Sequence, residues 1–192
     1  MLEKGSSVVV LLSGGVDSLV CAERMLAAGR LAGCVFVDYG HPARQREAWR
    51  AFAWAERRAV RLHVLHAMGL HLGEMTGGRG ASPQVVPARN AVFLAMAANV
   101  AASWGANCVA IGANQSDLAE YSDCRPCFLD RMSEALDQAC GVRVVAPLGR
   151  WTKPEIMQEA KRHGIGEGDA WACYGGGPKP CGACASCEAA ST

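Results

Sequence analysis

Two groups of residues in this chain have the types and spacing that chemistry requires. The first is the segment LLSGGVDS at positions 11–18, whose glycines would let backbone amides approach a phosphate closely. The second is a set of cysteines within the last twenty residues, namely Cys173, Cys181, Cys184 and Cys187. Thiolates are preferred ligands of zinc, so this second group would suit a metal ion.

The segment 11–18 follows a strand-like run and opens a helix-like one, so backbone amides and a helix N-terminus converge where an anion would lie. The hydroxyls of Ser13 and Ser18 can add further donors. An ordinary Gly/Ser-rich turn is the simpler alternative, but six matching residues in this context favour a phosphate-binding loop. The nucleotide contacts expected from the segment are Leu12, Ser13, Gly14, Gly15, Val16, Asp17, Ser18 and Leu19.

The residues that are absent from this segment restrict its chemistry. No Gly-Lys-Ser/Thr follows the glycines, so the segment is not a Walker A loop, and nothing is placed to grip a γ-phosphate. Asp17 can help to hold a magnesium ion or cap the following helix, and the sequence leaves both roles open. Val37, Asp38 and Tyr39 lie at the end of the second strand-like run, where a doubly wound fold would place the adenine and ribose.

The four C-terminal cysteines follow the pattern Cys-x7-Cys-x2-Cys-x2-Cys in a segment rich in Gly and Pro. The Cys-x2-Cys spacing lets two ligands reach one ion, and four thiolates leave no open coordination position, so we expect a structural zinc site. Four unrelated reduced cysteines are the alternative. A 4Fe-4S centre is a second alternative, although the ferredoxin-type run needs a further Cys-Pro that is missing after Cys187.

The remaining cysteines are expected to be packing residues. Cys124 and Cys127 form another Cys-x2-Cys that could indicate redox or sulfur-transfer chemistry, but Cys127 begins an apolar helical face. Core-like positions are predicted for Cys21, Cys34, Cys108 and Cys140.

The elements that must position these groups alternate along the chain. Five β-rich runs have continuous hydrophobicity, at residues 7–12, 31–39, 60–66, 107–113 and 142–148. Helix-like runs alternate with them, at residues 19–29, 44–58, 90–105, 127–140 and 153–163. This pattern predicts an α/β fold with a five-stranded parallel sheet, doubly wound, and helices on both faces. Residues 67–88 and 114–126 are expected to be loops.

The signals that bound a helix are clearest near residue 153. Thr152 can cap that helix, Glu155 can complete a capping box, and Gly164 can end it. We therefore divide the chain into a nucleotide-binding domain, residues 1–166, and a zinc-binding segment, residues 167–192, packed on the same domain.

Composition narrows the class of partner. The chain has 192 residues, of which 51% are hydrophobic, and a formal net charge of +1. That size allows one compact domain, and the charge provides no broad basic field, so nucleic acid is not an expected partner. No apolar run is long enough for a membrane span. Ten cysteines without a secretion signal favour a cytoplasmic protein with reduced thiols.

Several motifs occur in order along nearly the whole chain: SGGVDS (13–18), FVDYG (36–40), VVPARN (85–90), IGANQSD (111–117), YSDCRP (121–126), APL (146–148), TKPEI (152–156) and WACYGGGPKPCGACASC (171–187). With them the chain resembles the 7-cyano-7-deazaguanine synthases, which belong to the ATP pyrophosphatase (PP-loop) superfamily with its adenine nucleotide alpha hydrolase-like fold. It departs from that family in having His41-Pro42 after the DYG segment, Cys127 where a glutamate is common, and a shorter loop after the third strand.

The resemblance implies a reaction in queuosine biosynthesis. ATP with Mg²⁺ would adenylate the carboxylate of 7-carboxy-7-deazaguanine, and ammonia would displace AMP to give an amide. A second ATP would adenylate the amide oxygen, and AMP would leave as the nitrile forms. Zinc at the four cysteines and a homodimer are further implications of the family.

The resemblance also implies which residues line the site: Asp17, Ser18, Arg89, Asp123, Arg125 and Lys153. Arg89 or Arg125 would pair with the substrate carboxylate or the α-phosphate. Asp123 would accept hydrogen bonds from a guanine-like edge, and Lys153 would neutralise charge on the phosphates.

Three other functions are consistent with the same motifs. The enzyme could stop at the amide, which product mass would reveal. It could be a tRNA sulfur transferase of the PP-loop superfamily, but such enzymes commonly need an RNA-binding appendage and a working thiol. A non-catalytic zinc-bearing module is the last alternative, and the intact SGGVDS motif counts against it.

Overall fold

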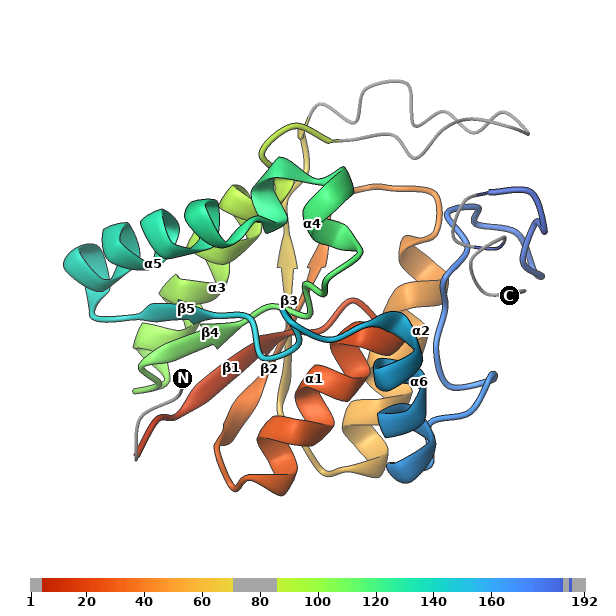
Figure 1. Cartoon of the computed structure of the whole chain (residues 1–192), viewed down its shortest axis with the longest axis horizontal. Helices are drawn as coiled ribbons and strands as arrows, with labels where there is room; N and C mark the ends of the chain where they lie inside the picture. The colour runs from red at the N-terminus through yellow and green to blue at the C-terminus, as the bar shows by residue number, and fades with distance from the viewer. Residues whose placement is uncertain (1–4, 71–85, 185–186, 188–192) are drawn as a thin grey trace.

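The computed structural model describes residues 5–70, 86–184 and 187 of the 192-residue chain. Within this part, five parallel strands form one sheet in the order β3-β2-β1-β4-β5 (Figure 1). The strands are β1 (Val8–Leu11), β2 (Leu31–Asp38), β3 (Leu62–His66), β4 (Cys108–Ala110) and β5 (Arg143–Val145). Each lies inside a predicted strand-like run, so the five-stranded parallel sheet is confirmed.

Helices cover both faces of the sheet, as the doubly wound fold requires (Figure 1). One face packs against α1 (Val16–Ala27), α2 (Arg44–Arg57) and α6 (Lys153–Arg162). The other packs against α3 (Arg89–Ser103) and α5 (Pro126–Cys140). Two short elements, α4 (Asp117–Glu120) and η1 (Ser122–Cys124), occupy the stretch that was predicted to be a loop.

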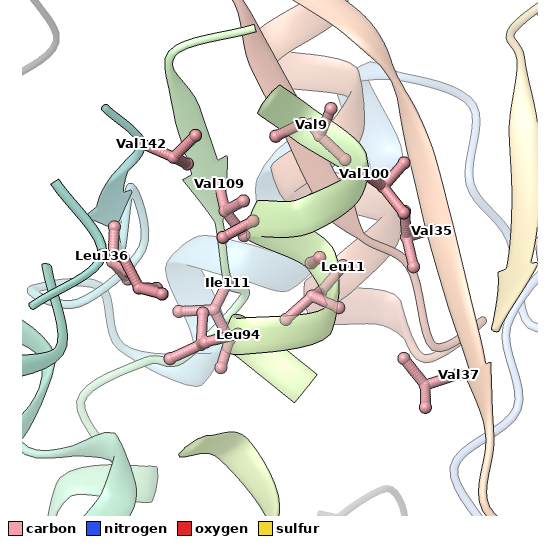
Figure 2. Close-up of a cluster of buried hydrophobic side chains, with 14 of the residues drawn as sticks. Val9, Leu11, Val35, Val37, Leu94, Val100, Val109, Ile111, Leu136 and Val142 are labelled. Carbon is pink, nitrogen blue, oxygen red and sulfur yellow. The ribbon is translucent and has the colours of Figure 1, made fainter. Parts of the chain in front are cut away.

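Alternation along the strands divides the buried side chains between the two faces, because successive residues of a strand point to opposite sides. The cluster facing α3 and α5 contains Val9, Leu11, Val35 and Val37, together with Leu94 of α3 (Figure 2). The cluster on the other face contains Val8, Val10, Cys34 and Phe36. Both faces are apolar, which explains the continuous hydrophobicity of the strand sequences.

The start of α1 differs from its prediction. The helix begins at Val16 rather than at Leu19, since Gly15 has extended backbone angles (φ −79°, ψ 155°) and takes the N-cap position. The start of α6 agrees with the sequence: Thr152 and Glu155 form a complete capping box, and Gly164 follows the helix with φ +71°. Only the first part of the phosphate loop, up to Gly15, is therefore non-helical. Val16, Asp17 and Ser18 belong to the first turn of α1.

The other cysteines are only partly as predicted. Cys21, Cys34 and Cys108 are buried, which confirms their packing role. The prediction for Cys140 is wrong: it is the last residue of α5 and is exposed, and its thiol bonds to the carbonyl of Leu136 one turn earlier. A helix end faces solvent more than the apolar pattern of its middle suggests.

Residues 71–85 of the predicted loop 67–88 lie outside the described residues. Among the helices that are described, none is long and apolar enough to cross a membrane.

The strand order reverses between β1 and β4. The chain goes from β1 to its neighbour β2 and then to β3, and later returns to the opposite side of β1 with β4 and β5. In open α/β sheets, ligands bind in the crevice at the carboxyl ends of the strands where this reversal occurs. The loop 12–15 after β1 and Gly112 after β4 lie at this point.

Candidate active site and metal centre

The phosphate loop is held in shape by its own serines. The hydroxyl of Ser18 donates to the carbonyl of Gly15 (2.8 Å) and accepts a hydrogen bond from the backbone N–H of Ser13 (3.1 Å). The two hydroxyls, of Ser13 and Ser18, are 3.1 Å apart, and the N–H of Gly15 donates to the Ser13 hydroxyl (3.3 Å). The loop is thus preformed, with hydroxyl and amide groups gathered at the start of α1.

Gly14 and Gly112 are glycines because the loop is tightly enclosed. Gly14 has φ +81°, and a Cβ there would clash with the backbone carbonyl of Glu47 in α2. A Cβ on Gly112 would lie 3.1 Å from the backbone of Asp17. Helix α2 and the end of β4 therefore enclose the loop from two sides.

We expect Gly14→Ala to abolish nucleotide binding and to destabilise the protein by roughly 1–3 kcal/mol, because it adds a backbone clash to an unfavourable φ. Binding of ATP by calorimetry and thermal unfolding measure the two effects. Gly29→Ala is the matched control: Gly29 also has positive φ (+64°), but nothing lies within 4 Å of an added Cβ. That variant should lose only about 1 kcal/mol. Unchanged ATP affinity in Gly14→Ala would contradict the loop assignment.

Asp17 and Lys153 form an ion pair beside the loop. The ammonium of Lys153, the first residue of α6, lies 2.7 Å from both carboxylate oxygens of Asp17. Because α1 has no side-chain cap, the helix-capping alternative for Asp17 is wrong. The side chains are 28% and 41% exposed, respectively, so both can be reached by a ligand.

Asp117, in the first turn of α4, adds a second carboxylate to this region. Burial is the largest cause that raises the pKa of Asp117, and the negative charge of Asp17 raises it further. Its carboxylate also accepts the backbone N–H of Asn114 (2.9 Å). Sequence reasoning did not select Asp117 as a site residue. Its position could have indicated the role, because it follows β4 closely, at the edge of the sheet where ligands bind.

Arg89 lies at the start of α3 next to the end of β2. Its guanidinium donates to the hydroxyl of Tyr39 (3.4 Å) and lies 5.9 Å from the centre of that ring. In the part of the chain that the structure describes, no carboxylate lies within ion-pair distance of Arg89. A half-buried cation without an acidic partner is suited to bind an anionic ligand.

His41 and Glu47 support this corner of the site beside Tyr39, and sequence reasoning missed both of them as members of it. The ring of His41 stacks on that of Tyr39, with centroids 4.1 Å apart and planes inclined by 14°. Nε2 of His41 lies 2.9 Å from a carboxylate oxygen of Glu47. The His41-Pro42 departure from the family motif is therefore built into the packing beneath Arg89.

Asp123 reaches α3 as well, whereas Arg125 does not. A carboxylate oxygen of Asp123 accepts the backbone N–H of Asn90 (2.9 Å), in the first turn of α3, and so lies near Arg89. Arg125 is exposed, and its Nε donates to the carbonyl of Leu118 (3.3 Å). The structure thus brings Arg89 and Asp123 together, while a substrate role for Arg125 stays a prediction.

Several predicted nucleotide contacts could act only through their backbone. The side chains of Leu12, Leu19 and Val37 are buried in the two clusters that flank the sheet. The carboxylate of Asp38 accepts the backbone N–H of Gly40 (2.9 Å) and so shapes the turn after β2. These contacts stay predictions.

Cys124 has the surroundings of a packing residue. It is buried, burial raises the pKa of its thiol to about 12, and the side-chain amide of Asn90 donates to its sulfur (3.2 Å). Cys127, the other member of the Cys-x2-Cys, is exposed on α5, so its predicted packing role is wrong: the buried face of the helix contains Leu129 and Leu136 instead. A thiol that stays protonated is a poor nucleophile, so Cys124 is not suited to sulfur transfer.

The four C-terminal cysteines come together and could bind a metal ion. The sulfurs of Cys173, Cys181, Cys184 and Cys187 all lie within 4.8 Å of one another. Those of Cys181 and Cys187 are 4.0 Å apart. A tetrahedral four-thiolate ion with bonds of about 2.3 Å needs sulfurs roughly 3.8 Å apart, so the cluster has the size for a single ion.

Backbone amides and burial shift the pKa values of these thiols in opposite directions. The N–H groups of Gly175 and Cys181 each donate to the sulfur of Cys173 (3.3 Å). The amide of Ala183 is the main cause that lowers the pKa of Cys181 to about 6, whereas burial raises that of Cys187 to about 12. A bound cation would displace the remaining protons.

Comparison with known proteins identifies the family. A family model described as "Queuosine biosynthesis protein QueC" matches residues 7–191. The chain belongs to this family. A 7-cyano-7-deazaguanine synthase from Rhizobium etli is 38% identical over 93% of the chain and 83% of its own length. One from Synechococcus sp. (strain CC9902) is 35% identical over 94% of the chain and 88% of its own length. The resemblance drawn from the motifs is confirmed.

The solved structures agree on the fold. The U34-tRNA thiolase NcsA from Methanococcus maripaludis, determined with its 4Fe-4S cluster, superposes with a TM-score of 0.61. It is 19% identical, and the match covers 85% of this QueC-family chain and 59% of the thiolase. At this identity the match supports the PP-loop fold alone.

Proposed function

We propose that this chain is a 7-cyano-7-deazaguanine synthase, a cytoplasmic ATP-dependent carbon–nitrogen ligase of queuosine biosynthesis. It converts 7-carboxy-7-deazaguanine and ammonia to the nitrile. The observation that carries the proposal is an identity of 35–38% to synthases of that name along more than nine-tenths of the chain. The preformed loop 13–18, at the reversal of strand order, supports it independently.

The amides of Gly14 and Gly15 and the hydroxyls of Ser13 and Ser18 would hold the pyrophosphate part of ATP. Lys153 would turn from Asp17 to the phosphates and balance their charge. Asp17 and Asp117 provide the carboxylate oxygens that Mg²⁺ prefers. When bound, that ion would stabilise negative charge on the phosphate oxygens.

In the first half-reaction the substrate carboxylate attacks the α-phosphorus, and the bond from that phosphorus to pyrophosphate breaks. Ammonia then adds to the acyl carbon, loses a proton, and expels AMP, which leaves the amide. The amide oxygen is adenylated in turn, and loss of AMP and protons from that adduct yields the nitrile. Arg89, which has no acidic partner of its own among the described residues, would orient the carboxylate. Asp123 would accept N–H groups of the guanine-like ring.

Zinc is the metal that the four-cysteine donor set fits best. Thiolates in a cluster sized for a single tetrahedral ion are typical of structural zinc, and such a set leaves no position for substrate. The ion would hold the segment after α6 in place, and metal analysis of the purified protein tests its identity. The homodimer is a family expectation that light scattering would test.

We expect Arg89→Lys to lower kcat/KM for the carboxylate substrate roughly 10- to 100-fold, because lysine keeps the charge but loses the bidentate geometry. The amide intermediate, supplied as substrate, has no carboxylate, so its conversion should fall much less. Steady-state kinetics with each substrate measure the difference. Equal losses for both substrates would instead indicate that Arg89 contacts a phosphate.

The proposal is tested by incubating the protein with ATP, Mg²⁺, ammonium and 7-carboxy-7-deazaguanine. AMP, pyrophosphate and the nitrile should form together, at two AMP for each nitrile. Product mass separates the nitrile from the amide. Accumulation of the amide alone would show that the enzyme stops after the first adenylation. Absence of substrate-dependent AMP would overturn the proposal.

A further inference from the structure

Trp171 connects the cysteine cluster to the phosphate loop through two hydrogen bonds. Its backbone N–H donates to the carbonyl of Gly14 (3.0 Å). Its indole N–H donates to the carbonyl of Cys173 (2.7 Å). Trp171 is thus hydrogen-bonded both to Gly14 of the loop and to Cys173, the first cysteine of the cluster.

The position of Trp171 depends on the cysteine segment. The residue is 7% exposed and packs in a small cluster with Ala43, Cys173 and Cys187. This cluster is separate from the two that flank the sheet. Figure 1 shows the chain after α6 returning along α2 toward the side of the sheet where the strands end. The position of Trp171 is therefore not determined by packing on the sheet alone.

The residues that precede and begin α2 complete the junction. The guanidinium of Arg46 lies over the Trp171 ring, 5.8 Å from its centre. Gly176 of the cysteine segment lies so close to Pro42 that a Cβ would clash with the carbonyl of Pro42. Glu47, in the first turn of α2, makes the corresponding close approach to Gly14. The cysteine segment and the phosphate loop are thus braced against the same short stretch of chain.

The bond to Gly14 matters because of the geometry of the peptide unit. The carbonyl of Gly14 and the N–H of Gly15 belong to one planar trans peptide, so they point in opposite directions. When Trp171 fixes the carbonyl, it also fixes the direction of the Gly15 N–H, one of the donors of the loop. A glycine at this position could otherwise rotate easily.

We propose that Trp171 is a positioning residue through which a metal ion at the four cysteines holds the phosphate loop in its anion-binding conformation. The inference rests on the proposed function for its ligand, ATP. The metal centre then serves the nucleotide site as well as the fold of the C-terminal segment.

The test is a thermodynamic cycle on ATP binding, measured by calorimetry with Mg²⁺ present. Removing the structural metal with a zinc-selective chelator should weaken ATP binding to the wild type roughly three- to tenfold, the size of one hydrogen bond. Metal-loaded Trp171→Ala should bind ATP about as weakly as the metal-free wild type does. Removing the metal from Trp171→Ala should not weaken its ATP binding further. Trp171→Phe, which keeps a ring but loses the indole bond, should lie between them.

The control variant is Trp49→Ala, which removes an indole that is 60% exposed on α2. Metal removal should weaken ATP binding to Trp49→Ala by the same factor as in the wild type. Because linkage is reciprocal, ATP should also tighten metal binding by the same factor in the wild type and not in Trp171→Ala. Far-UV circular dichroism of the stripped protein checks that it stays folded, so that the coupling is read between two folded states.

Two outcomes separate the inference from the proposed function. The inference is overturned, and the proposed function stands, if ATP binds with the same affinity with and without the metal. The same holds if metal removal weakens ATP binding to Trp171→Ala as much as it does in the wild type. If the metal-loaded wild type binds no ATP, the proposed function falls, and the inference falls with it.

Discussion

Replacing Asp17 by asparagine should lower the rate of AMP formation by about 10²- to 10³-fold and leave the melting temperature almost unchanged. The substitution keeps the shape of the side chain but removes the charge that faces Lys153 and would help to hold Mg²⁺. Both partners are partly exposed, and surface ion pairs contribute about 0–1 kcal/mol to stability. AMP release and thermal unfolding measure the two effects.

The control for this variant is an ion pair of similar exposure outside the site. Asp169 pairs with Arg57 at 2.8 Å, and the two side chains are 26% and 53% exposed. Asp169→Asn should change stability by a similar small amount and leave turnover unchanged. Near-normal turnover in Asp17→Asn would show that the loop does not bind nucleotide in the way proposed.

Cys184→Ser should abolish metal binding and release the chain around the four cysteines, while the α/β domain stays folded. Structural zinc contributes about 10–16 kcal/mol in small zinc peptides, so losing one of four thiolates removes most of what holds this segment. The two large clusters of buried residues contain none of the four cysteines, so the sheet and its helices should persist. Metal content per chain and limited proteolysis measure the outcome.

Cys127→Ser is the matched control, because Cys127 is an exposed free cysteine on α5, away from the cluster. It should retain the metal and resist protease like the wild type. Retention of one metal per chain in Cys184→Ser would remove that residue from the ligand set. Cooperative unfolding of the whole domain would show that the segment contributes to the main fold.

Much of this molecule could be predicted from local sequence. Continuous hydrophobicity identified all five strands, because both faces of the sheet are covered. The capping box at Thr152 and the glycine at 164 set the limits of α6 correctly, since a helix end depends on a few adjacent residues. The cysteine spacing predicted a cluster that the structure brings together. Each of these features depends on residues close together in the chain.

The arrangement of the site was decided by the tertiary structure. Asp17 and Lys153 are 136 positions apart, and only the packing of α1 and α6 on one face of the sheet makes them an ion pair. The stack of His41 on Tyr39 and the bond from Trp171 to Gly14 join distant segments in the same way. No local pattern encodes such pairs, because they depend on strand order and on how the helices cover the sheet. The sequence alone determined the elements and the kinds of chemistry, and tertiary packing determined which side chains meet.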